Sequence, residues 1–538
     1  MKENRQPLPD SLEILPDWLS PKPMVVQHTL SVPPPRLEDN TADVDRLVRA
    51  LRRDGFFPVR VDPWDLDPIS QELRRGGFTV TVVVGYQEDH WEILELTAGT
   101  SRDPVLGVAV DLGSSRLAFY LLDLEKGIVI DRRSEPNPQI PYGEDILTRI
   151  VYASDPDKRR RLQELLLSAF RDVVARMAAH KGLETSRIFA LTVAGNTTMS
   201  HFFLGLNTAN ICKEPYIPVA NRFPFLRGRD LALPMHPKGL VFVFPNVGSY
   251  FGGDLMAGIL ASGMHRREEL SLLVDVGTNA EVVLGNKDWL IACAGAAGPA
   301  LEGGVVERGM MAGPGAIDWV RIDPHTLDVQ YRVIGQEKPK GLCGSGLIDL
   351  VAEMFMAGIL TIRGTLNRNL PCARIVDTDN GPGFVVAWGA ETADGRDLVV
   401  SEIDIGILLK SKAAMYTILN IIARKVGVSL QEIHKFYVAG TFGNHIDPVM
   451  AIRIGMLPDL PLDTYEGLGN TAGRGAAMVL VDRTLLKDLE QVRNQITYVE
   501  LNVNVELMHE FRGATFLPHT DPGLFPSVPI PDRAKEGL

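Results

Sequence analysis

Cysteine is scarce in this chain. The 538 residues include only four cysteines, and no C-x-x-C pair occurs. Zinc sites and iron–sulfur clusters need several thiolates close together in the sequence or in the fold, and the spacing here suits neither. We therefore expect four buried free thiols and no iron–sulfur cluster in this chain. They are Cys212, Cys293, Cys343 and Cys372.

Long apolar runs and an excess of basic residues are also missing. No stretch reaches the roughly 18 uninterrupted apolar residues of a membrane span, and no apolar segment follows the polar N-terminus as it would in a signal peptide. The chain has 55 Lys and Arg against 67 Asp and Glu, a net charge of −12, which argues against nucleic acid as the main partner. These features predict a cytoplasmic protein that binds neither membrane nor nucleic acid.

Two common nucleotide-binding signatures are absent or lack their context. No G-x-x-x-x-G-K-[ST] occurs, so the chain is not a P-loop protein. Gly467, Gly469 and Ala472 fit G-x-G-x-x-A. However, residues 457–466 contain two prolines and no strand pattern, so this segment is not predicted to be a dinucleotide-binding turn.

The chain is too long for a single hydrophobic core and is expected to form several domains. Residues 1–32 are rich in proline and read as a linker or arm. Residues 33–104 combine a helical spacing of apolar residues at 44–51, stopped by Gly55, with a predicted hairpin that turns at 88–90. This segment is predicted to be a small α+β domain.

From residue 105 the order of predicted elements occurs twice. Three apolar runs joined by tight turns form a β-meander, helical patterns follow, and a buried strand comes next at 188–193. The same plan begins again at residue 272 and reaches its buried strand at 436–439. We predict an α/β fold of two duplicated lobes facing a cleft, with boundaries at 105–265 and 266–538.

The first turn of each meander carries nearly the same motif, V-D-L-G-S-S in one and V-D-V-G-T-N in the other. Glycine lets the backbone approach closely, and the N–H and hydroxyl groups of such a turn face an anion. An Asp at the end of the strand suits Mg²⁺, usually through water. One such loop is as well explained by an ordinary hairpin turn, whereas two at matching points favour phosphate binding. The residues are Asp111, Gly113, Ser114, Ser115, Asp275, Gly277, Thr278 and Asn279.

Three further segments are candidates for the same site. Gly440, Thr441, Phe442 and Gly443 end a predicted strand with small residues, where adenosine can lie against the backbone. Asp254 is a candidate to orient the attacking water or to accept its proton, and its alternative role is a helix N-cap.

Gly195, Asn196 and Thr197 are predicted either to contact phosphate or to cap the next helix. The glycine-rich turns at 298–303 and 341–346 open predicted helices. Each is a candidate anion site or a close contact between helix and sheet.

The order of two phosphate loops and an adenosine loop resembles the superfamily of acetate and sugar kinases, Hsp70 and actin, in which two ribonuclease-H-like lobes close on Mg-ATP. Longer strings resemble the reductive activators of corrinoid proteins over residues 25–520. The strings are P-R-L-E-D at 35–39, N-P-Q at 137–139 with Y-G-E-D at 142–145, A-G-N-T-T-M at 194–199, G-P-A-L-E-G at 298–303, G-L-C-G-S-G at 341–346 and A-G-T-F-G at 439–443.

This resemblance implies an ATPase that couples ATP hydrolysis to the one-electron reduction of Co(II) to Co(I) on a corrinoid iron–sulfur protein or a methyltransferase corrinoid protein. It implies ATP and Mg²⁺ as ligands, with Asp111 and Asp275 near the metal and Asp254 near the attacking water. It also implies a homodimer, and it makes residues 33–104 the family's middle domain.

Two departures accompany the resemblance. Ser114 and Ser115 replace the usual pair of threonines, which keeps both hydroxyls. The cysteine-rich ferredoxin-like domain of the family has no counterpart in this sequence, so a ferredoxin-like electron donor, separate or removed, is expected. The alternatives from the same superfamily are a small-molecule kinase and an ATP-switched binding module.

Overall fold

The computed structural model describes residues 16, 18–277, 279–296, 306–443, 445–500 and 505–535. The chain divides into two compact units. Among the described residues, the first unit comprises those up to Ala261 together with Asn470–Gln495, and the second comprises those from Ser262 to Gly469 and from Ile496 onward. Residues 470–495 therefore belong with the first unit, whereas the sequence predicted a single break near residue 265.

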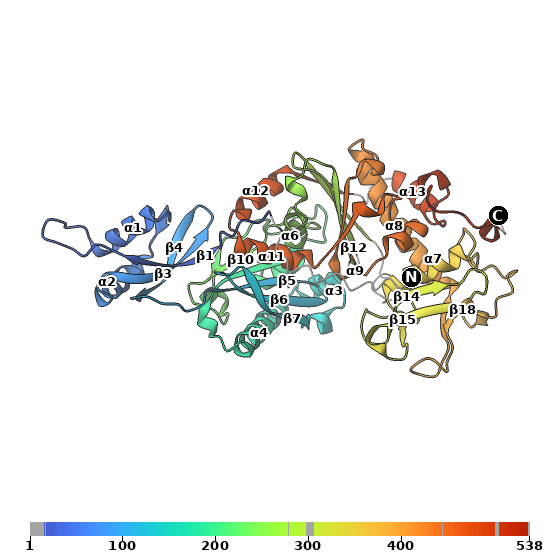
Figure 1. Ribbon diagram of the computed structural model, residues 1–538, viewed down its shortest axis with the longest axis horizontal. Helices are drawn as coiled ribbons and strands as arrows, with labels where there is room; N and C mark the ends of the chain where they lie inside the picture. Colours follow the sequence, from blue (N-terminus) through green and yellow to red (C-terminus); the bar gives the residue numbers. More distant parts are fainter. Residues whose placement is uncertain are drawn as a thin grey trace. The chain divides into compact units, whose positions relative to one another are not determined.

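The first unit begins with a four-stranded sheet in the order β1-β3-β4-β2, with two helices beside it (Figure 1). Its elements are β1 (Val25–Ser31), α1 (Asp43–Arg53), β2 (Val59–Arg60), α2 (Leu66–Arg75), β3 (Thr79–Gln87) and β4 (His90–Ala98). The predicted helix and hairpin are both present. The predicted arm at residues 1–32 is wrong in part, because β1 pairs with β3 along its whole length.

The second sheet of the first unit has the order β7-β6-β5-β8-β10-β9. Its strands are β5 (Leu106–Leu112), β6 (Arg116–Asp123), β7 (Ile128–Pro136), β8 (Ile188–Gly195), β9 (Leu226–Arg227) and β10 (Leu240–Val243). β5, β6 and β7 form the predicted antiparallel meander. β8 runs parallel to β5 and β10 runs parallel to β8, so these three strands end at the same edge of the sheet.

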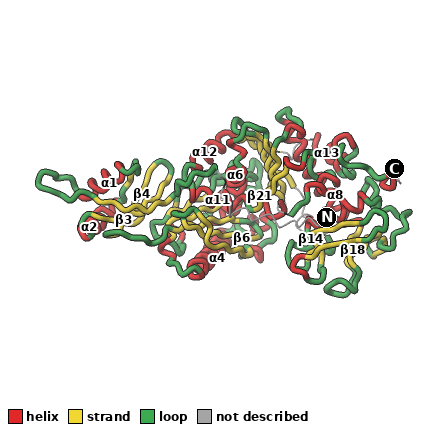
Figure 2. Tube along the Cα trace, in the orientation of Figure 1, coloured by secondary structure: helices red, strands yellow, loops and turns green. Residues whose placement is uncertain are grey.

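Helices cover both faces of this second sheet, and Figure 2 shows α4 and α11 beside its strands. Val108 and Val110 of β5 pack in a core with α4 (Pro156–His180). On the opposite face lies α11 (Thr471–Val481), whose Ala476 carbonyl accepts a hydrogen bond from the Thr192 hydroxyl at 2.8 Å. Because successive side chains of a strand alternate between faces, Asp111 lies on the α11 side of β5.

The main sheet of the second unit has the order β21-β20-β11-β12-β13-β22. Its strands are β11 (Ser271–Val276), β12 (Asn279–Gly285), β13 (Leu290–Ala296), β20 (Lys435–Ala439), β21 (Tyr465–Gly469) and β22 (Ile496–Glu500). β11, β12 and β13 form a meander, and β20 and β21 continue the sheet in parallel from β11. Five consecutive strands thus match those of the first unit in order and direction, which confirms the predicted duplication.

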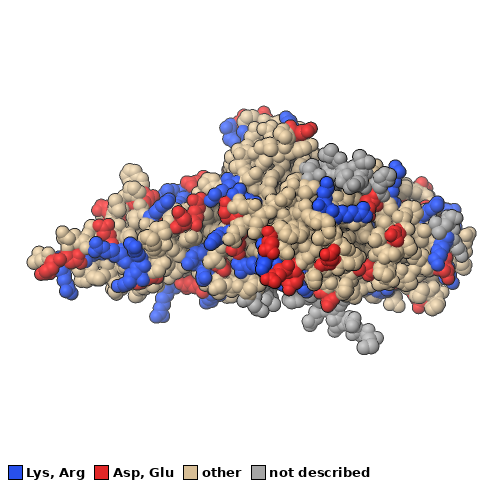
Figure 3. Space-filling model, turned by 90° about the horizontal axis from the view of Figure 1, so that it is seen from above, with Lys and Arg blue, Asp and Glu red and all other residues tan. Residues whose placement is uncertain are grey.

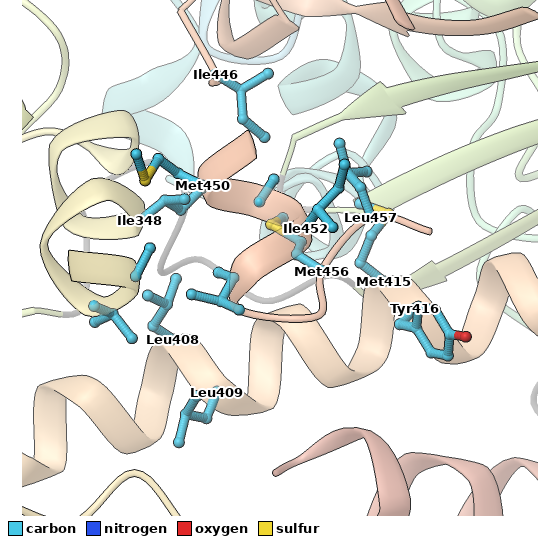
Figure 4. Close-up of a cluster of buried hydrophobic side chains, with 14 of the residues drawn as sticks. Ile348, Leu408, Leu409, Met415, Tyr416, Ile446, Met450, Ile452, Met456 and Leu457 are labelled. Atoms are coloured by element: carbon cyan, nitrogen blue, oxygen red, sulfur yellow. The ribbon is translucent and has the colours of Figure 1, made fainter. Parts of the chain in front are cut away.

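Apolar helices contribute much of the core of the second unit. Ile348 of α7 (Gly344–Met356), Leu408 of α8 (Glu402–Lys425) and Met450 of α10 (Pro448–Arg453) belong to one buried cluster (Figure 4). Within the described part of the chain, α8 alone is long and apolar enough to cross a membrane, and 72% of its most apolar window is buried. This burial is the pattern of a core helix in a soluble protein.

Small three-stranded sheets complete the second unit. One has the order β15-β14-β16 and the other β17-β18-β19. The strands are β14 (Ala316–Ile322), β15 (Val329–Val333), β16 (Gly341–Leu342), β17 (Ile375–Thr378), β18 (Gly381–Ala387) and β19 (Leu398–Ser401).

On the face of the molecule drawn in Figure 3, Lys and Arg side chains are interspersed with Asp and Glu and do not gather into a field of one sign.

A glycine sets the distance between two helices of the first unit. A Cβ atom added to Gly475 of α11 would lie 2.2 Å from the carbonyl oxygen of Ala257 in α6 (Gly253–Ser262). No side chain fits there without separating the helices, so Gly475 allows α6 and α11 to pack closely.

We expect Gly475→Ala to lower the free energy of unfolding of the first unit by about 1–3 kcal/mol, the usual cost of overpacking. Thermal unfolding followed by calorimetry measures the effect. Gly406→Ala in α8 is the matched control: its added Cβ meets nothing within 4 Å, so helix propensity predicts a gain of up to about 1 kcal/mol. An unchanged midpoint for Gly475→Ala would contradict the close packing.

Candidate functional site

Asp111 ends β5 and is held by a residue far away in the sequence. Asn470 donates from its side-chain Nδ2 to Asp111 Oδ2 at 2.8 Å. The side-chain oxygen of Asn470 also caps α11, because it accepts from the backbone N–H of Gly473 at 2.8 Å. One amide therefore fixes the carboxylate of Asp111 beside the N-terminus of a helix, where a negative charge is favoured.

The turn after Asp111 is pinned from behind by buried donors. The guanidinium of Arg149, which is fully buried, donates to the carbonyl of Ser114 at 2.7 Å and to that of Gly143 at 2.7 Å. The side chain of Asn137 donates to the carbonyl of Gly113 at 2.9 Å. Because these carbonyls are occupied, the loop is fixed with its carbonyls turned toward Asn137 and Arg149.

Arg149 and Asn137 hold this turn through backbone carbonyls and not through carboxylates. Arg149 also donates to the carbonyl of Glu144 at 3.2 Å, and burial lowers its pKa. The backbone N–H of Asn137 donates to the carbonyl of Ser115 at 2.9 Å. The string N-P-Q thus supports the turn after Asp111 directly through Asn137, and the string Y-G-E-D supports it indirectly, because its carbonyls hold the side chain of Arg149.

The residues after β8 take the capping role that the sequence left open. Asn196 is the N-cap of α5 (Thr197–Phe203), and its side chain accepts from the backbone N–H of Met199 at 2.9 Å. The hydroxyl of Thr197 donates to the carbonyl of Gly248 at 2.6 Å. A Cβ atom on Gly195 would lie 2.8 Å from the carbonyl of Leu112, so glycine lets this turn approach β5. Phosphate binding by these three residues stays a prediction.

Asp254 lies in the first turn of α6 rather than at its cap. The helix begins at Gly253, whose N–H donates to the side chain of the buried Asn246 at 3.1 Å. Asp254 Oδ1 accepts from the backbone N–H of Leu255 at 2.8 Å. Burial raises the pKa of Asp254 to about 6. A carboxylate with this pKa is suited to accept a proton near neutral pH.

The strand ends bring these groups to one edge of the first unit. Asp111 pairs in register with Ala194, two residues before Asn196. A Cβ atom on Gly252 would lie 2.4 Å from Cα of Asn196 and 2.8 Å from Oδ1 of Asp254. The loops after β5, β8 and β10 therefore converge, as parallel strands of an α/β sheet make them do.

The second unit repeats part of this arrangement, namely an Asp near the end of a strand beside a glycine that follows the neighbouring parallel strand. Asp275 near the end of β11 pairs in register with Ala439 of β20, and Gly440 follows with φ of +80°. A Cβ atom on Gly440 would lie 3.0 Å from Oδ1 of Asp275. Glycine at 440 thus permits the left-handed backbone and leaves the space beside the Asp275 carboxylate unfilled.

Some predicted site residues lie outside the described part of the structure. They are Thr278, the side chains of Asn279, Thr441 and Phe442, and residues 298–303. Gly277 follows β11, and Gly443 ends the single helical turn α9 (Gly440–Gly443). In the turn at 341–346, a Cβ atom on Gly346 would lie 2.2 Å from the carbonyl of Ile317, so this glycine serves contact between helix and sheet.

The structure corrects the sequence analysis at residues 465–472. A strand, β21, begins at Tyr465 and includes both glycines of the G-x-G-x-x-A segment, and α11 begins at its Thr471. The strand is short and contains two glycines, so neither propensity nor alternation indicated it. Asn470, between the strand and the helix, is the site residue that the sequence did not reveal, although its place before an apolar helical run is typical of an N-cap.

Two lobes of the same strand order, each with an Asp and a Gly turn after its first strand, define an α/β protein of the actin-like nucleotide-binding class. Family models match three consecutive segments: the RACo linker region at residues 19–103, the RACo middle region at 106–267, and the C-terminal ASKHA domain of RACo at 269–529. The chain belongs to the RACo family.

Individual relatives agree with this assignment. The chain is 30% identical to the corrinoid activation enzyme RamQ of Eubacterium limosum, over 77% of this chain and 71% of that protein. It is 24% identical to the Co(II) methylated amine-specific corrinoid protein reductase of Methanosarcina barkeri, over 73% of each chain. A solved reductive activator for corrinoid, iron–sulfur protein matches with a TM-score of 0.86 and 37% identity, over 96% of this chain and 82% of that one.

The family models correct the name given to residues 33–104. The sequence analysis assigned residues 33–104 to the middle domain, but the linker model covers this segment, and the middle region is 106–267. The ASKHA domain of the family model begins at residue 269, so the first lobe is the middle region in the family's terms.

The hydrogen bonds from Arg149 to the turn after Asp111 can be tested by substitution. Arg149→Gln leaves at least one buried loop carbonyl without its donor, at a cost of about 1–3 kcal/mol. If half of that cost falls on nucleotide binding, affinity for ATP falls about two- to tenfold. Titration calorimetry with ATP checks this. Arg160→Gln, on the exposed face of α4, removes the same charge and is expected to leave the affinity unchanged. Equal affinities in all three proteins would contradict the positioning role.

Proposed function

We propose that this chain is an ATP-dependent reductive activator of a corrinoid protein. In this function one electron converts inactive Co(II) to Co(I) on the partner, and the donor loses that electron. Hydrolysis of ATP to ADP and phosphate accompanies the transfer. The observation that supports the proposal most directly is the match of all three family segments, in order, over residues 19–529.

The described residues suit Mg-ATP. The carboxylates of Asp111 and Asp275 offer the hard oxygen groups that Mg²⁺ prefers. A hydrogen bond fixes the Asp111 carboxylate, and Gly440 leaves space beside that of Asp275. We propose that Asp111 and Asp275 hold Mg²⁺ through water and that the loops at 113–115 and 277–279 bind the phosphates. Gly440 to Gly443 are proposed to lie beside adenosine. Bound Mg-ATP supplies the free energy of hydrolysis.

Asp254 is proposed as the group that accepts the proton of the attacking water. Its carboxylate is half-buried, and its pKa of about 6 leaves it ionised but basic at neutral pH. The hydrogen bond from Leu255 N–H fixes one oxygen, Oδ1, so that the second oxygen, Oδ2, is the one assigned to the proton.

The energetic purpose of hydrolysis is to drive electron transfer. Each 100 mV that one electron must climb costs about 2.3 kcal/mol. We propose that the electron comes from a ferredoxin-like iron–sulfur protein or domain and that the activator works in the cytoplasm as a homodimer. The corrinoid partner is proposed to be a corrinoid iron–sulfur protein or a methyltransferase corrinoid protein.

Replacing Asp254 tests its role. Asp254→Asn is expected to lower the ATP hydrolysis rate at least about 100-fold, the lower end of general-base effects. The wild-type rate is expected to fall as pH drops through about 6, where the carboxylate becomes protonated. Steady-state phosphate release against pH measures both. Asp172→Asn, on the exposed face of α4, is the control.

The same variant separates catalysis from stability. A raised pKa means that the charged form is less favourable in the folded state, so this carboxylate opposes folding above pH 6, and the penalty fades as pH falls from 6 toward 4. Asp254→Asn is therefore expected to unfold at an equal or higher temperature at pH 7. Loss of both activity and stability would indicate a structural role instead.

Partner dependence tests the function as a whole. We expect phosphate release to rise when a Co(II) corrinoid protein is added, and Co(I) to accumulate, by its absorption spectrum, only with ATP and a ferredoxin reductant present. Transfer of radiolabelled phosphate to an added sugar or acid would instead identify a small-molecule kinase. Tight ATP-dependent binding to a partner, without any Co(I), would identify a binding module.

A further inference from the structure

A groove of about 750 Å³ opens within the first unit, away from the loops described above. Four separate parts of the chain line it: Gly55 with Phe57, the β3–β4 hairpin, the segment from Arg222 to Pro245, and the segment from Arg483 to Glu490. The last of these includes most of the first two turns of α12 (Leu485–Gln495). Arg227 joins the second part to the third, since it forms an ion pair with Glu92 of the hairpin, so the hairpin is fixed against the middle region.

The walls of this groove are aromatic. Tyr86, Phe225 and Phe242 line it, and Phe57 at its rim is 58% exposed. Trp91 lies beneath, in edge contact with Tyr86 at 5.2 Å between ring centroids. Aromatic and apolar walls with a few polar groups are typical of small-molecule sites of 300–1,000 Å³.

Two cations of the groove form no ion pair among the described residues, although the neighbouring Asp482 attracts Arg483 electrostatically. The guanidinium of Arg483 lies over the Trp91 ring at 4.6 Å and donates a hydrogen bond to the carbonyl of Pro23 at 3.5 Å. Burial lowers the pKa of Arg483. Lys487 is exposed, and no side-chain partner is found for it among the described residues.

The acidic residues of the groove are already engaged. Asp89 contacts His90 at 3.0 Å, Glu490 pairs with Arg493 at 2.7 Å, and Glu88 faces Arg222 at 3.8 Å. Asp482, next to Arg483, accepts from the hydroxyl of Thr484 at 2.7 Å. The lining carries as many acidic as basic side chains, and Arg483 and Lys487 are the two basic ones that form no ion pair among the described residues.

We propose that this groove is a binding site for a small flat anion, with a ring that packs against Tyr86 and Phe225 and a carboxylate or phosphate that pairs with Arg483 and Lys487. Arginine suits the role because its planar fork of donors matches either anion. The site is independent of the proposed function, since none of its residues belongs to the phosphate or adenosine loops.

The test uses 8-anilinonaphthalene-1-sulfonate, a fluorescent flat anion, with the full chain and no nucleotide. We expect one salt-sensitive site whose Kd rises at least about fivefold in Arg483→Gln/Lys487→Gln. Arg229→Gln/Lys181→Gln makes the same change of charge at exposed positions outside the groove, and its Kd is expected to match the wild type.

A second variant guards against loss of packing at Arg483. Lys487→Glu reverses an exposed charge without touching the Trp91 ring, and it is expected to raise the Kd of the probe by a similar factor. Identical titrations of the wild type and both groove variants would overturn the proposal.

Displacement of the probe then identifies the source of the anion. Displacement by adenosine monophosphate assigns the site to nucleotides, and displacement by indole-3-acetate assigns it to aromatic carboxylates. Displacement by neither at millimolar concentration would overturn the assignment to a small flat anion.

Discussion

The first unit depends on one hydrogen bond between distant residues, from Asn470 to Asp111 at 2.8 Å. It exists because the chain leaves the main sheet of the second unit through β21 and returns to the first unit, where α11 covers the sheet that contains β5 and β8. The same amide caps α11 and fixes the carboxylate at the end of β5. Closure of a loop this long is costly in chain entropy, and the packing of α11 against β5 and β8 offsets that cost.

Around that bond, buried side chains hold the turns at the edge of the sheet. The donors of Asn137 and Arg149 occupy the carbonyls of the turn after Asp111, and the side chain of Asn246 holds the first N–H of α6. Asp254 differs from these groups, because burial raises its pKa to about 6 although backbone hydrogen bonds oppose that shift. A perturbed pKa of this kind is more common at functional sites than elsewhere, which supports the proposal that Asp254 acts as a base.

The repeated meanders and most helices could be predicted because their signals are local. Alternation, apolar spacing and Gly turns placed the hairpin at residues 79–98 and the strands that carry Asp111 and Asp275. β1 and β21 were missed for the opposite reason. Nearby prolines obscure β1, and the glycines of β21 weaken its propensity, so both strands form because a neighbouring strand pairs with them.

The sequence by itself determined the duplicated plan, the two Asp-Gly loops and the family, because each rests on a short contiguous motif. Only the tertiary structure decided how single residues are used: Asn196 as a cap, Asp254 inside a helix turn, Arg149 as a donor to loop carbonyls, and Asn470 as the partner of Asp111. It also decided that residues 470–495 belong to the first unit. Burial and long-range hydrogen bonds set these roles, and neither is encoded within a local window of the chain.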